Sequence, residues 1–504
     1  MEKLIKILQY DQEAPLLFTR LYFWIFLAIS FAIYSVIYRH RALRNTYLFI
    51  ISLFFYYKSS GLFFLLLVFS TVFNYAIGLS IYASRSELWK KIFIAFSVVI
   101  NLVVLSYFKY AYFFTETFNQ TFHTDFKVFN YLALWSNNVS GSHFDVSRIF
   151  LPVGISFFTF QTMSYVIDLY RGKCPPVKNV IDFGFYVSFF PQLVAGPIVR
   201  ASEFVPQLYQ KYIITKEEFG YALYMIMKGL FKKLVLGDYL AVNFIDRIFE
   251  TPTLYTGFEN LMALYGYSLQ VYCDFAGYTD IAIGVALLMG FRLPTNFNSP
   301  YKAENVGDFW KRWHMSLSSW LKDYLYIPLG GNKKGRFMTN VNLMITMLLG
   351  GLWHGADAKF IIWGGLNGLG LVVYKFWKKI SPYENRKGLL VHVWKIFLTF
   401  NFITFTRIWF RADDMERVRS ILFQLTHNLN LSVIPQVVIA YKLVFAVMLL
   451  GFIIHWWPSR WKDNYMNWFI RTPYWAKILI VAALVFLVYQ TQTADLQPFI
   501  YFQF

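Results

Sequence analysis

Charged residues are scarce in this sequence. Asp, Glu, Lys and Arg make up only 15% of its 504 residues, whereas an average soluble domain carries roughly 25%. Hydrophobic residues account for 57%, and apolar runs recur from one end of the chain to the other. This composition excludes a string of soluble domains and predicts one all-α, multi-pass membrane domain over residues 1–504.

Cysteine and the familiar motifs of soluble enzymes are also missing. Cys174 and Cys273 are the two cysteines, so there is no disulfide framework and no spacing of Cys and His that binds zinc. The chain has no glycine-rich nucleotide loop or dinucleotide fingerprint, no serine elbow, and no histidine followed five positions later by aspartate. We therefore expect neither a metal site nor a bound cofactor.

The positive charges are distributed as in a membrane protein. Lys and Arg outnumber Asp and Glu by 47 to 28, a net charge of +19, and they form short clusters between apolar runs. Such clusters mark cytoplasmic loops, so we expect contact with membrane lipid and not with nucleic acid. The first apolar run follows a polar stretch and lacks a small-residue cleavage site, which predicts no cleavable signal peptide.

These basic clusters predict how the chain crosses the membrane. They favour about twelve spanning helices, within a range of about 11–13, and place both termini outside. Residues 183–199 contain Pro191 and Pro197 and have basic residues on both sides, which favours a re-entrant segment. The expected spans are Leu21–Tyr38, Thr46–Tyr57, Leu62–Tyr82, Ile92–Phe114, Phe150–Tyr170, Tyr221–Phe244, Leu261–Phe291, Phe337–Trp353, Phe360–Trp377, Val391–Phe410, Leu443–Trp457 and Ala476–Tyr489.

The densest charges lie in a polar stretch, residues 308–356, which also holds two histidines that each follow a tryptophan. Reading residues 305–324 as one helix places Trp310, His314, Leu317 and Leu321 on one face. An amphipathic helix on the inner membrane surface is one interpretation. A segment that dips into the membrane and turns back is the other, and it explains why His314 shares the tryptophan face.

The second histidine, His354, ends the apolar run 337–353, directly after Trp353. Gly350, Gly351 and Gly355 surround it, and glycine permits a close approach of backbone or substrate. A buried imidazole stays neutral, as a general base must. An interfacial histidine at a helix end is the competing interpretation.

Other polar groups fall inside the apolar runs. Asp274 and Asp280 lie within 261–291, where a charge costs about 2.5–3.5 kcal/mol. Each is expected to line a cavity or to pair with a basic group, and Arg407 and Arg411 are either their partners or interface anchors. The sequence Gly364-x-x-x-Gly368 predicts a notch for helix packing.

Several of these blocks occur together in a known family. Residues 310–332 and 350–356 resemble the two signature blocks of the membrane-bound O-acyltransferase (MBOAT) family, especially its bacterial alginate, peptidoglycan and teichoic acid branch. Further matching blocks are LPVGISFFTF at 151–160, FPQLVAGPIVR at 190–200, DFAGY at 274–278 and NFNSPY at 296–301. The resemblance implies a ring of tilted helices around a thin, funnelled centre.

The resemblance also implies roles for particular residues. His354 is the family's essential histidine, and His314 is the second one. Asp274, Trp353 and Asn296 are expected to line the cavity. The phosphates of acetyl-CoA would be bound by basic residues near the first block, and the donor-binding candidates are Lys311, Arg312, Trp313, Lys333 and Lys334.

The implied activity is acetyl transfer across the bacterial inner membrane. Acetyl-CoA is the expected donor, and a periplasmic SGNH-type O-acetyltransferase is the expected partner. The composition, rich in Phe, Ile, Lys and Tyr, suggests an AT-rich genome and thereby favours peptidoglycan over alginate or another exopolysaccharide. A transporter of an acylated carrier is the alternative from a different functional class.

The C-terminal motif FIYFQF, residues 499–504, resembles the end of the small partner peptide in the D-alanylation system. By that resemblance Tyr501 would relay the acyl group on the outer, periplasmic face. A tail in the aromatic belt of the membrane is the other interpretation.

Overall fold

The computed structural model describes residues 9–11, 15–140, 145–384, 386 and 388–491, and these residues form helices and no strand. The all-α prediction is confirmed. The tail with Tyr501 lies outside the described residues. The α-helices are α2 (Leu21–Ile37), α3 (Arg41–Ser60), α4 (Phe64–Ala83), α5 (Glu87–Leu105), α6 (Ala111–Phe122), α7 (Tyr131–Ser140), α8 (Ile155–Tyr170), α9 (Val180–Ser188), α10 (Phe190–Leu193), α11 (Ala201–Leu208), α12 (Lys216–Leu230), α13 (Asp246–Glu250), α14 (Gly257–Leu288), α15 (Val306–Trp310), α16 (Met315–Leu321), α17 (Gly335–His354), α18 (Ala358–Ile380), α19 (Leu389–Arg411), α20 (Met415–His427), α21 (Ile434–Ala440), α22 (Lys442–Trp456), α23 (Ser459–Arg471) and α24 (Tyr474–Thr491).

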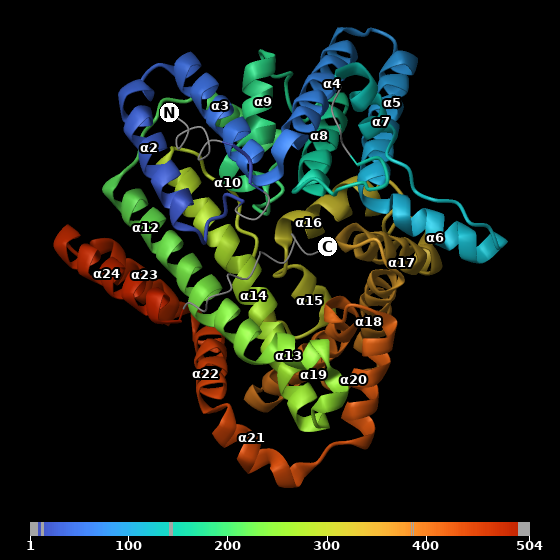
Figure 1. The fold of residues 1–504 in the computed structure, drawn as a ribbon, viewed down its shortest axis with the longest axis vertical. Coiled ribbons are helices and arrows are strands. Elements are labelled where there is room, and N and C mark those ends of the chain that lie inside the picture. The colour runs from blue at the N-terminus through green and yellow to red at the C-terminus, as the bar shows by residue number, and fades with distance from the viewer. Residues whose placement is uncertain (1–8, 12–14, 141–144, 385, 387, 492–504) are drawn as a thin grey trace.

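Helix α14 forms the centre of the molecule, and α12 lies along it (Figure 1). Helix α12 continues as the π-helical segment η3 (Phe231–Asp238). The two helices run antiparallel with their backbones almost in contact. A Cβ added at Gly229 would lie 2.5 Å from the carbonyl oxygen of Gly277, and one added at Gly284 would lie 2.6 Å from the carbonyl oxygen of Ala222. In the most apolar 18-residue stretch of α14, 94% of the residues are buried inside the protein.

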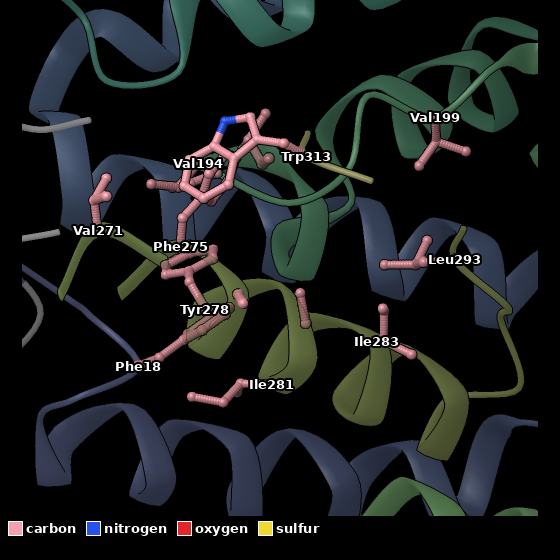
Figure 2. Packing of buried hydrophobic residues seen from close by; sticks show 14 of the residues in the cluster. Phe18, Val194, Val199, Val271, Phe275, Tyr278, Ile281, Ile283, Leu293 and Trp313 are labelled. Atoms are coloured by element: carbon pink, nitrogen blue, oxygen red, sulfur yellow. The ribbon is translucent and has the colours of Figure 1, made fainter. Parts of the chain in front are cut away.

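Apolar side chains on all sides of α14 bind it to the rest of the chain (Figure 2). The ring of Phe18, from the N-terminal segment, stacks on Tyr278 with the centroids 4.4 Å apart. On another part of the helix, Phe275 meets Phe297 edge to face at 5.0 Å. This side of α14 leads to the polar stretch that contains both signature blocks.

Six helical runs of the described chain are long and apolar enough to cross a membrane, or seven if the bent pair over residues 431–456 counts as one span. The protein is therefore a multi-pass membrane protein. The sequence-based total of about twelve is higher because it includes shorter segments such as α2, which has 17 residues. That total stays a prediction.

The segment predicted to be re-entrant is broken into short pieces. Helix α9 ends at Ser188, the four-residue α10 follows, and the chain from Asp182 to Val199 is buried throughout. Irregular backbone at membrane depth requires such burial within protein. The observed break fits a re-entrant segment and gives no support to a straight span.

Both aspartates of α14 pair with lysines of the adjacent α12–η3 helix. Lys233 Nζ lies 2.6 Å from Asp274 Oδ1, and Lys232 Nζ lies 2.8 Å from Asp280 Oδ2. The antiparallel course of η3 beside α14 places these groups opposite one another. Breaking such a buried pair leaves an uncompensated charge, so the lysines bind the two helices together.

The arginines considered as partners of these aspartates contact other groups, which corrects the expectation. Arg411 pairs with Asp246 at 2.8 Å, and Arg407 donates a hydrogen bond to the carbonyl oxygen of Ser268 at 3.0 Å. Both arginines lie on α19, and lysines nearer to the two aspartates already occupy their carboxylates.

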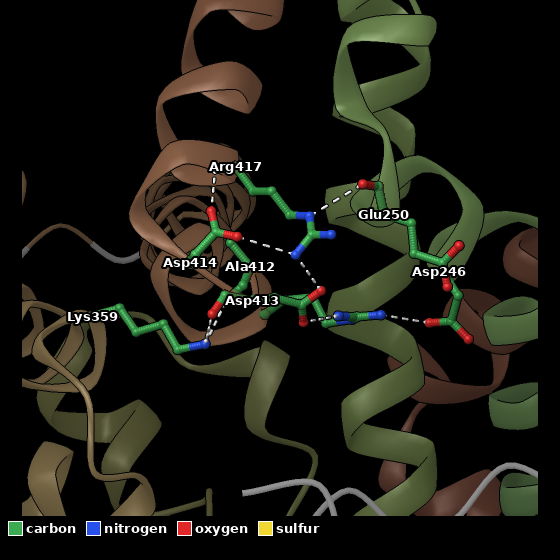
Figure 3. Close-up of polar contacts among 8 residues, drawn as sticks. Asp246, Glu250, Lys359, Ala412, Asp413, Asp414 and Arg417 are labelled. Carbon is green, nitrogen blue, oxygen red and sulfur yellow. Dashed lines mark hydrogen bonds and ion pairs between the residues drawn. The ribbon is translucent and has the colours of Figure 1, made fainter. Parts of the chain in front are cut away.

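A polar network fixes α20 near the end of α19 (Figure 3). Arg417 donates to the carbonyl oxygen of Glu250 on α13 at 3.1 Å, and Lys359 donates to the carbonyl oxygens of Ala412 and Asp413 at 2.6 and 2.9 Å. The network thereby joins α13, α18 and α20 at the end of α19 that carries Arg407.

The predicted glycine notch is confirmed, and it lies between α17 and α18. A Cβ at Gly364 would meet the carbonyl oxygen of Met347 at 2.3 Å and the Cα of Gly351 at 3.1 Å, and one at Gly368 would meet the sulfur of Met344 at 2.9 Å. The two helices therefore approach at backbone distance, and this contact positions the end of α17.

Gly364→Ala should lower the free energy of unfolding by about 1–3 kcal/mol, because the added methyl group overlaps the backbone of α17. The measurement is thermal unfolding of the purified protein in detergent. Gly365→Ala is the matched control, since its Cβ would meet only Leu348 Cδ2, at 3.4 Å. Equal melting temperatures for the two variants would contradict this account of the notch.

Candidate functional site

The chain around His314 breaks where one continuous helix was predicted. Helix α15 ends at Trp310 and α16 begins at Met315, and between them His314 has a left-handed backbone with φ 44° and ψ 55°. A non-glycine residue in this conformation costs on the order of 1–3 kcal/mol. The single amphipathic face over residues 305–324 is therefore wrong, and tertiary contacts must offset this strain.

Asn296, in the extended chain after α14, supplies those contacts. Its main-chain carbonyl accepts a hydrogen bond from the Met315 N–H at 3.0 Å. Its side-chain oxygen accepts from the N–H and the hydroxyl of Ser316, at 3.1 and 3.0 Å, and lies 3.2 Å from His314 Nδ1. Local periodicity could not reveal the break, because its cause, Asn296, lies 18–20 positions away in the sequence.

The same contacts assign the tautomer of His314. The Ser316 N–H must point to an acceptor, so the Asn296 atom beside it is the amide oxygen. That oxygen can only accept, so His314 Nδ1 carries the proton. In a neutral His314 ring the other nitrogen, Nε2, then holds a lone pair that can accept a hydrogen bond.

The second histidine is the last residue of α17, whose end is held by a distant segment. The Lys109 ammonium donates to the carbonyl oxygens of Trp353 and His354, at 2.7 and 3.3 Å, and the Tyr110 hydroxyl donates to that of Leu352 at 2.9 Å. A helix leaves its last carbonyls without partners, and a cation there also suits the helix dipole. Lys109 thus fixes the position of His354.

Sequence reasoning missed Lys109, although a signal was present. It is a lone lysine inside the apolar run 92–114, and a charged residue within a membrane span is a functional hypothesis by default. It lies in a π-helical turn, η2 (Ser106–Tyr110). Such turns are often found at functional sites.

The two histidines, 40 positions apart in sequence, meet in a buried aromatic cage. Their ring centroids are 6.4 Å apart, and the exposed fractions are 0% for His314 and 3% for His354. The Trp353 ring lies 6.0 Å from the first and 5.0 Å from the second. Phe275 contacts His314 at 4.7 Å, and Trp363 contacts His354 at 5.1 Å.

A small cavity opens beside His354. Its volume is about 20 Å³, which exceeds the roughly 10–15 Å³ that one ordered water needs. The cavity therefore has room for a small group next to the His354 ring. The lining residues are Val271, Phe275, Phe309, Trp313, His354, Trp363, Asn367, Ile403, Thr406, Arg407 and Phe410.

Arg407 is the charged residue of this lining, and the sequence did not predict that position. Its guanidinium carbon lies 4.7 Å from the centre of the Trp313 ring and 5.1 Å from that of Tyr301. Arginine stays charged and offers five N–H donors. The cavity therefore combines a histidine, an amide, a hydroxyl and a permanent cation within an apolar wall.

The other predicted cavity residues have different positions. Trp353 and Asn296 contact the histidines, but neither is among the residues that line this cavity. Asp274 faces the α12–η3 helix and pairs with Lys233. Successive residues of a helix point in different directions. Asp274 therefore faces the α12–η3 helix, while its neighbour Phe275 lines the cavity.

The predicted donor-binding residues separate into two groups. Trp313 lines the cavity, and its neighbour Arg312 pairs with Asp308 at 2.9 Å, while Lys311 is exposed. The exposed residues Lys333 and Lys334 directly precede α17, whereas His354 ends it. A 20-residue helix is about 30 Å long, so these two lysines lie far from the histidines.

A family model described as MBOAT, membrane-bound O-acyltransferase, matches residues 175–412. The chain is 32% identical to a peptidoglycan O-acetyltransferase of Helicobacter pylori, over 96% of this chain and 97% of the relative. It is 38% identical to a probable alginate O-acetylase of Pseudomonas aeruginosa, over 79% and 72%, and 32% identical to a teichoic acid D-alanyltransferase of Bacillus subtilis, over 50% and 67%.

Lys109→Met should loosen the end of α17, since a hydrogen bond to a charged group contributes about 1.5–3 kcal/mol. We expect amide hydrogen exchange in residues 348–356 to become roughly tenfold faster or more. Lys90→Met is the control, because Lys90 lies on neighbouring α5 and pairs with the exposed Glu87. Unchanged exchange in Lys109→Met would show that the ammonium does not hold this helix end.

Proposed function

The chain belongs to the membrane-bound O-acyltransferase (MBOAT) family, and we propose that it takes acetyl from cytoplasmic acetyl-CoA and passes it across the bacterial inner membrane. A periplasmic SGNH-type O-acetyltransferase would then place the acetyl on peptidoglycan. The observation that carries this proposal is the meeting of two buried histidines, His314 and His354, beside a small cavity that His354 lines. The relative named for peptidoglycan O-acetylation supports the polymer, since the similarity covers nearly the full length of both chains.

His354 acts in this proposal as the general base. It removes the proton of an acceptor hydroxyl, whose oxygen attacks the thioester carbonyl. The C–S bond then breaks as the new C–O bond forms, and the proton passes to the departing thiolate. General-base catalysis of this kind contributes typically 10²–10⁴-fold. Lys109 supports the step by holding the backbone of His354 in place.

His314 and Arg407 have separate roles in the same step. Because His314 Nδ1 donates to Asn296, its Nε2 has no proton to donate, so the His314 ring is suited to position the acyl group by contact and not to donate a hydrogen bond to its carbonyl. Arg407 lines the cavity and carries a permanent charge, so it is suited to stabilise the oxyanion that develops on the thioester carbonyl.

Alginate is the second candidate polymer. Its support is the 38% identity to a probable alginate O-acetylase. The membrane chemistry is the same for both polymers, so they differ only in the acceptor outside. A transporter of an acylated carrier would behave differently, because it has no reason to cleave the thioester.

His354→Ala should reduce the release of coenzyme A thiol from acetyl-CoA by at least about 100-fold in purified protein. His314→Ala should also reduce it. The exposed His427 on α20 supplies the control, and His427→Ala should keep full activity. A folded His354→Ala protein with wild-type thiol release would overturn the proposal, and absence of release from the wild type would favour the transporter.

Tyr501 is proposed as the acyl relay on the periplasmic side. Tyr501→Phe keeps the ring and removes the hydroxyl that would carry the acetyl group. We expect cells that carry the variant at the wild-type level in the membrane to lose acetylation of their wall polymer. Wild-type wall acetylation in these cells would assign residues 499–504 to the aromatic belt instead.

A further inference from the structure

Four lysines gather between the α12–η3 helix and the segments at the end of α22. Lys228 and Lys232 reach the same carboxylate, Asp280, at 3.2 and 2.8 Å. Lys302 lies in the short helix η6 (Pro300–Lys302) and donates to the carbonyl oxygen of Trp457 at 2.6 Å. Lys462, on α23, completes this lysine cluster and donates to the carbonyl oxygen of His455 at 2.7 Å and to the Ser299 hydroxyl at 3.1 Å.

Positive charge in the lysine cluster exceeds the negative charge around it. Within the described part of the chain, Lys302 and Lys462 form no ion pair with a carboxylate, and Asp280 serves both other lysines. Burial lowers the pKa of Lys462 to about 8, together with the charges of Lys302, Lys232 and Lys228. Lys462 thus lies within electrostatic reach of the other three lysines and of Asp463, whose charge raises its pKa.

His455 adds a neutral donor beside the cluster. Its Nε2 accepts a hydrogen bond from the Tyr301 N–H at 3.2 Å, so in the neutral ring Nδ1 carries the proton. His455 is only 3% exposed, and no acceptor for Nδ1 occurs among the residues that the structure describes. A buried polar group without a partner calls for an explanation, and an external ligand is one.

We propose that the lysine cluster and His455 bind a phosphate group. Ammonium groups bind phosphate as point charges, and an imidazole N–H adds a directed donor. The side chain of Lys228 is 31% exposed, which leaves the cluster open to a ligand. A phosphate would offset the surplus positive charge and accept the unused hydrogen bond at the same time.

The cluster lies close to the acyl cavity. Lys232 Nζ is 5.0 Å from the centre of the Tyr272 ring, and that ring is 5.8 Å from Tyr301. The Tyr301 ring is in turn 6.3 Å from Trp313, which lines the cavity. A donor with phosphates at one end and a thioester at the other could therefore occupy both sites. This assignment to the donor rests on the proposed function, and an anionic lipid headgroup offers the same phosphate chemistry.

The test replaces the two lysines that form no ion pair among the described residues, in the double variant Lys302→Gln and Lys462→Gln. We expect the KM for acetyl-CoA to rise at least tenfold while kcat changes little. S-acetylpantetheine, a thioester without phosphate, should be cleaved as by the wild type. The charge-conserving pair Lys302→Arg and Lys462→Arg should retain a low KM for acetyl-CoA, which a merely structural role of the lysines would not predict.

Lys378→Gln with Lys379→Gln is the matched control, because both lysines are exposed and lie in the last turn of α18, outside the cluster. It should leave the KM for acetyl-CoA unchanged. If the double variant does not fold, Lys462→Gln alone gives the same comparison, with a smaller rise in KM.

A second arm identifies the source of the phosphate. The melting temperature is compared in nanodiscs of phosphatidylglycerol and of phosphatidylcholine. If the phosphate belongs to a lipid, phosphatidylglycerol should raise the melting temperature of the wild type but not of the glutamine variant. The KM for acetyl-CoA should then be the same for both proteins. If neither KM nor this lipid-dependent shift differs between wild type and variant, the site does not exist. Cleavage of S-acetylpantetheine by the wild type but not by His354→Ala tests the proposed function separately.

Discussion

The last carbonyl groups of α17 need hydrogen-bond donors that neither the helix nor an apolar surrounding can supply. Lys109 and Tyr110, almost 250 positions earlier in the chain, provide them. On the other side, Gly351 lets α18 pack at backbone distance. The position of His354 thus follows from two constraints on one helix end, and the aromatic cage around both histidines depends on it.

Charged side chains inside the protein likewise need partners. The aspartates of α14 are opposed by lysines of the α12–η3 helix, and these pairs bind the two central helices together. Where lysines outnumber carboxylates, around Lys302 and Lys462, the imbalance marks a place for an anion. The α12–η3 helix thus carries both the lysine that pairs with Asp274 and the lysines of the proposed phosphate site. Tyr272 and Tyr301 lie between that site and the acyl cavity.

Sequence patterns predicted the parts of this structure that depend on composition and on neighbouring residues. Hydrophobicity predicted an all-α membrane protein, and the glycines at 364 and 368 predicted a close helix contact. The two histidines were found from their surroundings of tryptophan and glycine. In each case the physical cause lies within a few residues, so a local pattern can carry the information.

Features that arise from distant contacts could not be predicted in this way. The left-handed backbone of His314 is stabilised by Asn296, and the capping of α17 comes from Lys109. The cation in the cavity, Arg407, was predicted to be either a partner of the aspartates or an interface anchor, because sequence alone does not show which way a helix faces. Sequence proximity likewise placed Lys333 with the donor site, although a whole helix separates it from His354.

The central claim is that the cavity beside His354 is where the acyl group is transferred. A cryo-EM structure of the full chain in nanodiscs, bound to a non-hydrolysable acetyl-CoA analogue, tests it most directly. The account predicts density for the acetyl end between His354 and Arg407, within hydrogen-bonding distance of the His354 ring. Density for the acetyl end elsewhere, with this cavity unchanged, would contradict it.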